Sequence, residues 1–308
     1  MPNLKEVKGR IKSVNSTQQI TKAMKMVAAS KLRRAQDVIL QMRPYADKLE
    51  SILQRVTNLQ DDHIENVYAL PKDVNKVLVI VIGSDKGLCG GFNSNLLKST
   101  VLHINEKYQK IQAEGNLVIL PIGRKAFEYF SKRDYTVISD FYTLQHNLSF
   151  VNAKPAVEFA MGGFADGAFD RVDLIYNEFK NVATQIIRRV QFLPIPEFVE
   201  DLEQENDYEE DYHNAYKASS IQKDYIFEPS VEYIIHEIIP QSLRIAFYKA
   251  LLESNASEQG ARMTAMDKAT ENAGELLKDL TLMYNRTRQA AITKEILEIV
   301  GGADALEK

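Results

Sequence analysis

The chain has 308 residues, 45% apolar composition and a formal net charge of −4, which allows about two domains with one sizeable core. Its single cysteine excludes an intramolecular disulfide, and no run of eighteen apolar residues predicts a transmembrane helix. The first residues lack the apolar centre of a signal peptide, so we expect a cytosolic protein.

The first predicted element is a very long helix over residues 1–60. Steps of alternately four and three residues from Val7 to Val56 reach fifteen positions, of which twelve are apolar. This repeat keeps one narrow stripe on a helix and is typical of the seam of a left-handed coiled coil. About fifty helical residues extend for roughly 75 Å, which is longer than a small globular domain. The pattern therefore predicts a rod that meets a partner helix.

The same segment is strongly basic. Residues 5–34 carry nine Lys or Arg side chains and a single acid, Glu6. Such an excess indicates an acidic surface opposite the helix. DNA is one such surface, but the basic residues share the register of the seam and are sparser than in DNA-binding basic helices. A protein partner is the better interpretation.

After a linker over residues 61–75, residues 76–196 alternate between strands and helices. Five strands are predicted, at Val77–Ile82, Leu117–Ile122, Tyr135–Ile138, Asp173–Asn177 and Val190–Leu193. Helices are predicted at about residues 94–114, 124–132 and 153–165. Strands buried on both faces and separated by helices predict a mainly parallel, Rossmann-like α/β domain. The alternation in Gln185–Leu193 is compatible with an antiparallel edge strand.

A glycine-rich turn, Gly83–Gly91, follows the first strand, where α/β domains bind phosphates and dinucleotides. The phosphate-loop pattern fails because Gly87 is followed by Leu88, and the glycine spacing does not match the dinucleotide fingerprint. The five histidines are scattered, and Cys89 has none nearby in the sequence. We therefore predict a non-catalytic chain without cofactor, metal ion or direct small-molecule ligand.

The remainder divides into an acidic segment and a second long helix. Residues 197–228 form the acidic segment, with nine acids and no Lys or Arg between 197 and 211, which predicts a solvated loop. Residues 229–308 form the helix, in which small residues recur every fourth position: Ser257, Ala261, Ala265, Ala269 and Ala273. Small residues allow two helices to approach closely. Gly301 and Gly302 indicate a helix stop.

Because both long helices adjoin the same central domain, an antiparallel coiled coil of N- and C-terminal helices is the most economical arrangement. The predicted fold is this coiled coil with an α/β domain inserted between its helices. The alternative is a pair of amphipathic helices folded onto a globular core.

Three separated motifs resemble the gamma subunit of the rotary ATP synthase of bacterial type. They are ITKAMKMVAASKLRRAQ with RPYA, then GSDKGLCGGFN, then SEQGARMTAMDKATENAGEL followed by NRTRQAAITKEILEIVGGA. The resemblance runs from Lys5 to Ala303 with order and spacing kept. It implies a shaft of paired helices inside a ring of alternating catalytic and non-catalytic subunits, with the α/β domain outside at the base.

The resemblance also implies a function and partners. The chain would transmit torque between a proton-driven membrane ring and the catalytic subunits. Its partners would be the alpha and beta subunits of the catalytic hexamer, the epsilon subunit and the membrane c-ring. It would be a peripheral protein at the cytoplasmic face of the bacterial inner membrane. It would bind no nucleic acid.

Individual residues acquire expected roles in the same way. The resemblance implies catalytic-subunit contacts for seven residues: Met24, Lys25, Lys86, Arg262, Arg288, Gln289 and Thr293. It implies contacts with the membrane ring for Tyr225, Phe227 and Glu228. Phe227 replaces a tyrosine often found in that family, so a hydroxyl contact is lost there. Met24 has a second interpretation, as a side chain that only packs in the seam.

Two other functions are compatible with the sequence. A coiled-coil adaptor or nucleic-acid-binding protein with an α/β head would bind acidic polymers in a salt-dependent manner. A nucleotide-dependent enzyme would require a ligand at Gly83–Gly91.

Overall fold

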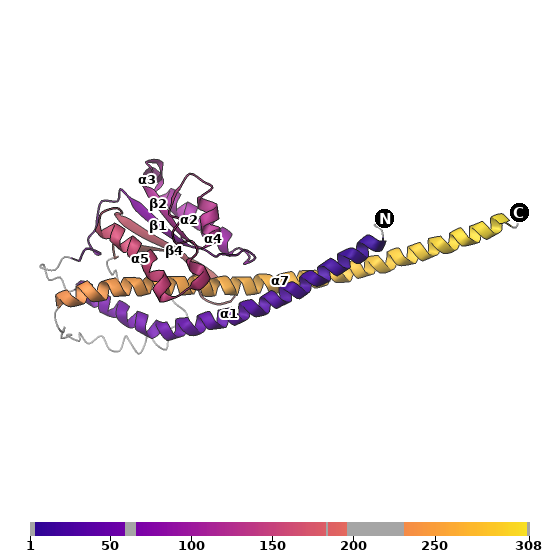
Figure 1. Cartoon of the computed structure of the whole chain (residues 1–308), viewed down its shortest axis with the longest axis horizontal. Helices are drawn as coiled ribbons and strands as arrows, with labels where there is room; N and C mark the ends of the chain where they lie inside the picture. The colour runs from indigo at the N-terminus through magenta and orange to yellow at the C-terminus, as the bar shows by residue number, and fades with distance from the viewer. Residues whose placement is uncertain (1–3, 59–65, 183, 196–230, 307–308) are drawn as a thin grey trace.

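Two long antiparallel helices and a five-stranded α/β domain make up the computed structural model, which describes residues 4–58, 66–182, 184–195 and 231–306 (Figure 1). Helix α1 (Leu4–Asn58) has 55 residues and helix α7 (Val231–Leu306) has 76. They run side by side, and the C-terminal end of α7 continues alone beyond the start of α1 (Figure 1). The predicted stop at Gly301 and Gly302 is wrong, because α7 passes through both glycines. Glycine lowers helix propensity by about 1 kcal/mol but keeps the backbone donor that the helix needs.

The predicted seam of α1 is confirmed. Every seam position from Val7 to Leu49 whose side chain the structure describes is buried or half-buried. Six apolar members are fully buried: Val7, Ala28, Leu32, Ala35, Ile39 and Leu49. The facing residues of α7 include the small Ala256 and Gly274, and a Cβ atom on Gly274 would lie 3.0 Å from Gln18 Nε2. Close approach of the helices therefore explains this glycine.

The sheet has the strand order β3-β2-β1-β4-β5. The strands are β1 (Val77–Ile82), β2 (Leu117–Ile122), β3 (Thr136–Val137), β4 (Arg171–Phe179) and β5 (Gln185–Leu193). The first four are parallel, whereas β5 is antiparallel to β4 and forms the edge. The mainly parallel α/β prediction and the antiparallel edge are both confirmed.

Helices cover both faces of this sheet. The α/β domain contains α2 (Phe92–Lys107), α3 (Gln109–Ala113), α4 (Arg124–Phe130), η1 (Leu144–Asn147) and α5 (Phe150–Ala165). Residues of α2 and α4 pack on one face of the sheet, and residues of α5 and α7 pack on the other. Phe247 of α7 is completely buried in that second core. One helix, α7, thus belongs both to the core of the α/β domain and to the coiled coil.

Candidate functional site

The glycine-rich turn between β1 and α2 is held closed by its own hydrogen bonds. The Ser84 amide donates to Asn93 Oδ1 over 3.0 Å, and Asn93 Nδ2 donates to Ser84 Oγ over 2.7 Å. Ser84 Oγ in turn donates to the Lys86 carbonyl over 2.8 Å. Leu88 lies at the tip with a φ of 63°, a left-handed conformation that costs energy in a residue other than glycine, and its side chain is 66% exposed. The turn therefore presents Leu88 and the exposed Lys86 side chain to the outside.

Arg262 of α7 anchors this turn to the shaft. Its Nη2 donates to the carbonyls of Lys86 and Gly87, over 3.0 and 3.4 Å, and its Nη1 lies 2.5 Å from Glu258 Oε1. Burial raises the pKa of Glu258, although the Arg262 guanidinium opposes that shift. The structure therefore brings the predicted residues Lys86 and Arg262 together. The contacts of the Arg262 guanidinium described above are all with groups of this same chain.

A polar layer crosses the seam close to the same level of the shaft. Lys25 Nζ lies 2.5 Å from Asp267 Oδ1, and the hydroxyls of Thr21 and Thr270 are 2.8 Å apart. Both partners of the ion pair are more than one-third exposed, so solvent screening leaves it little stabilising energy. Polar contacts in a coiled-coil seam instead fix the register of the two helices. Met24, beside Lys25, is half-buried.

The free end of α7 carries the remaining predicted contact residues. The antiparallel register set by Lys25 with Asp267 brings the start of α1 to about residue 288 of α7. Arg288, Gln289 and Thr293 are all exposed at or beyond that point. Large exposed apolar side chains surround them: Leu282, Met283, Ile292, Ile296, Leu297, Ile299 and Val300. Exposed apolar surface of this extent marks a contact with another molecule.

Among the described residues, two kinds of feature would point to other sites, a cluster of metal ligands and a membrane-spanning helix. These residues contain no cluster of three His, Cys, Asp or Glu side chains that could hold a metal ion. Within the same ranges, none of the helices combines the length and apolar character needed to cross a bilayer. Tyr225, Phe227 and Glu228, the predicted contacts with the membrane ring, lie outside the described residues, as does the acidic stretch 197–211.

Sequence reasoning missed a buried polar network in the α/β domain. Asp173 on β4 accepts hydrogen bonds from His103 Nε2 and the Tyr108 hydroxyl, each over 2.6 Å, and from Arg171 Nε over 3.1 Å. Burial alone would raise the pKa of Asp173, but these three partners lower it below its ordinary value. The network ties the end of α2 to the sheet. No local sequence pattern predicts this network, because its members are up to 70 residues apart in the chain.

Comparison with known proteins finds relatives along the whole chain. Residues 3–306 match the family model described as ATP synthase. The chain is 54% identical over 306 residues to the ATP synthase gamma chain of Cytophaga hutchinsonii, covering 99% of both chains. It is 46% identical over 308 residues to the ATP synthase gamma chain of Amoebophilus asiaticus, covering 100% of both.

Two solved structures have a similar fold. One comes from the central stalk and c-ring of the Tetrahymena thermophila mitochondrial ATP synthase, with a TM-score of 0.55 and 27% identity. The match covers 81% of this chain and 99% of that one. The other comes from the Euglena gracilis mitochondrial ATP synthase, with a TM-score of 0.63 and 21% identity over 98% of this chain and 94% of that one.

Proposed function

The chain belongs to the ATP synthase gamma chain family, and on this premise we propose that it is the central rotor shaft of a bacterial ATP synthase. It transmits torque between a proton-driven membrane ring and the catalytic subunits, and it catalyses no reaction itself. One observation carries the proposal: α7 is a single helix that runs from the core of the α/β domain, through the seam with α1, to an exposed apolar end.

The continuity of α7 is what a torque-bearing part requires. Phe247 fixes the helix in the α/β core, and Leu280 fixes it in the seam, 33 residues further along. These positions are about 50 Å apart at 1.5 Å per residue, without a proline or loop between them. Rotation applied to the α/β domain therefore reaches the far end through one hydrogen-bonded backbone, with α1 bracing it laterally.

The proposed contacts follow this geometry. Arg288, Gln289 and Thr293, with the apolar side chains around them, face the catalytic subunits at the free end of α7. Lys86 and the half-buried Met24 and Lys25 contact them nearer the α/β domain, where a basic surface suits acidic partners. Arg262, the seventh proposed contact, also supports that region by holding the glycine-rich turn in place.

We assign the end of the shaft that carries the α/β domain to the base of the complex. Tyr225, Phe227 and Glu228 rest on the membrane c-ring, and the α/β domain meets the epsilon subunit. The assembled complex lies at the cytoplasmic face of the inner membrane. The seven catalytic-subunit contacts and these three ring contacts are proposals made residue by residue from the family resemblance.

A rotation assay tests the proposal. The single cysteine, Cys89, is buried, so a bead would attach selectively to a new surface cysteine. Lys110→Cys places this cysteine on α3, away from the shaft. In a complex with immobilised alpha and beta subunits, ATP should drive the bead in one direction. A stationary bead during ATP hydrolysis by the intact complex would contradict the rotor assignment. Isolated chain should neither hydrolyse ATP nor bind it in a calorimetric titration.

A further inference from the structure

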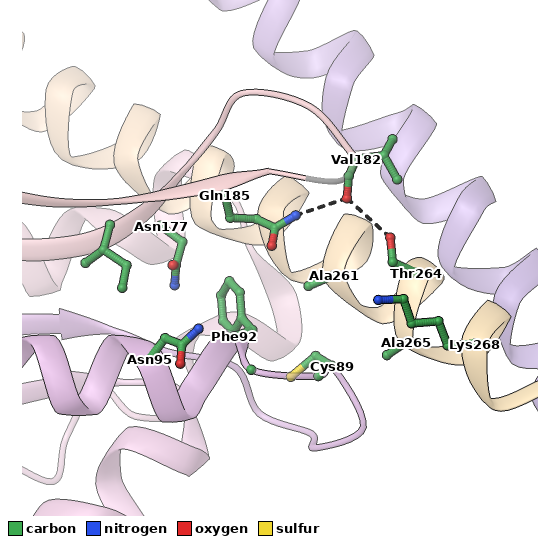
Figure 2. Close-up of a pocket in the computed structure, with 13 residues that line it drawn as sticks. Cys89, Phe92, Asn95, Asn177, Val182, Gln185, Ala261, Thr264, Ala265 and Lys268 are labelled. Atoms are coloured by element: carbon green, nitrogen blue, oxygen red, sulfur yellow. Dashed lines mark hydrogen bonds between the residues drawn. The ribbon is translucent and has the colours of Figure 1, made fainter. Parts of the chain in front are cut away.

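A cleft of about 240 Å³ opens where the glycine-rich turn, the β4–β5 hairpin and α7 meet (Figure 2). From β1 the chain adds β2 and β3 on one side of the sheet and then crosses to β4 on the other side. The cleft lies outside the carboxyl ends of β1 and β4, at this change of direction. Open α/β sheets bind their ligands at this topological position.

Asn177, near the carboxyl end of β4, lines the cleft with an unused donor. Asn177 is 2% exposed, and its Nδ2 atom makes no hydrogen bond within the described part of the chain. Figure 2 shows this amide pointing from β4 toward Asn95 of α2, across the space beside Phe92. A buried amide donor without an acceptor is unfavourable, because it has lost its hydrogen bonds to water. The unmet donor points to a ligand with an acceptor oxygen.

The charge around the cleft favours an anion. Lys268 of α7 lines it, and Figure 2 shows the ammonium group directed back toward the same space. The first turn of α2 also borders the cleft, and its cap residue, Gly91, supplies no side-chain hydrogen bond to the helix. The Phe92 amide at the start of this turn already donates to the Cys89 carbonyl, so the turn attracts negative charge chiefly through the positive end of the helix dipole. The residues that line the cleft include no Asp or Glu.

Size and lining narrow the class of ligand. Phe92, Ile187, Ala261 and Ala265 give the cleft an apolar wall. Its volume lies below the range of pockets for drug-sized ligands, which begins at about 300 Å³. Inorganic phosphate or a short organic acid matches this space, and a nucleotide does not.

We propose that the cleft binds a small oxyanion, either inorganic phosphate or a short-chain carboxylate. Asn177 Nδ2 donates a hydrogen bond to it, and Lys268 neutralises its charge. The cleft is lined by the sheet, α2 and α7, so an anion bound there lies at the joint between the α/β domain and the shaft and stiffens it. This site is additional to the proposed rotor function and departs from the sequence-based expectation of no small-molecule ligand. Its parts come from segments about 80 residues apart, which no local motif reveals.

Binding to the full-length chain tests the proposal. Calorimetric titrations and thermal unfolding are run in phosphate-free buffer with inorganic phosphate or with propionate, and potassium chloride matches the ionic strength. We expect saturable binding at one site per chain and a rise in Tm with the anion that occupies the cleft. The stronger of the two probes identifies the chemical source of the oxyanion.

Three variants give the test its specificity. Asn177→Leu removes the unused donor and should abolish binding without lowering the Tm of the anion-free chain. Lys268→Gln should weaken binding about tenfold, the effect expected for loss of one charged hydrogen bond. Lys278→Gln removes the same charge from an exposed position ten residues along α7 and should leave binding unchanged.

Several results would overturn the site. One is the absence of saturable binding for both anions, and another is binding that survives both Asn177→Leu and Lys268→Gln. A large drop in the Tm of anion-free Asn177→Leu would show that the amide already has a partner within the fold. If Lys268→Gln and Lys278→Gln weaken anion binding equally, the anion is attracted by the basic side chains along α7 in general and not by a specific site in the cleft.

Discussion

Helix α7 contains two stretches of similar composition in opposite surroundings. As far as Leu280 most of its large apolar side chains are buried or half-buried against α1 or the α/β core, with Tyr233 and Leu276 as exposed exceptions, whereas from Leu282 onward they are largely exposed. An isolated helix is only marginally stable in water, so the first stretch owes its stability to internal packing. The exposed stretch has apolar contacts left for another molecule. The same kind of residue thus supports the fold in one part of the helix and recognition in the other.

The largest expected effect comes from the internal stretch. Phe247→Ala removes a completely buried ring from the core between α7 and the sheet. We expect the free energy of unfolding to fall by about 3–5 kcal/mol, since lost burial and the cavity both contribute. Urea unfolding of the isolated chain measures this. Ile299→Ala, at a side chain that is 68% exposed, is the matched control and should change stability by less than about 0.5 kcal/mol. Similar losses in both variants would remove the distinction between the stretches.

A smaller effect is expected at the last buried seam position. Leu280 is 7% exposed and packs where α1 is the neighbouring helix. Leu280→Ala should cost about 2 kcal/mol, the lower end for such a truncation, because two helices can close partly around the gap. The complex assembled with this variant should keep its ATP hydrolysis rate. A variant that unfolds normally but uncouples the complex would place Leu280 among the external contacts.

These internal positions differ in how far the sequence predicts them. The seam of α1 follows from a regular repeat, because one partner helix lines its whole length. The part of α7 around Phe247 shows no such repeat, since the sheet, α5 and α1 surround it on several sides. The failed phosphate-loop spacing predicted that the glycine-rich turn is no nucleotide site, but only the structure shows Arg262 holding it. The Asp173 network and the Asn177 cleft depend on contacts between distant segments, which local patterns do not encode.

The Asp173 network gives the internal region a pH dependence. The folded-state pKa of Asp173 lies below its unfolded value, so its contribution is complete above about pH 3.9 and is lost as the pH falls through the folded pKa. We expect the α/β domain to lose stability in this acid range. Asp173→Asn should destabilise the chain at pH 7 by about 1–3 kcal/mol and by less at low pH. Urea unfolding at both pH values measures the difference. An unchanged difference between wild type and variant at the two pH values would exclude the ionised carboxylate as the cause.

The smallest effect on stability is expected at the free end, where Arg288 and Gln289 are exposed. Replacing both by alanine empties no core and breaks no side-chain hydrogen bond seen within the described residues, so stability should stay within about 0.5 kcal/mol. ATP hydrolysis by the reconstituted complex should fall severalfold, because a charged hydrogen bond to a partner contributes about 1.5–3 kcal/mol. Lys278→Ala, exposed on the paired stretch, should leave both quantities unchanged. If the double variant instead unfolds early and turns over normally once assembled, these side chains serve the helix itself, and recognition at this end rests on the apolar residues alone.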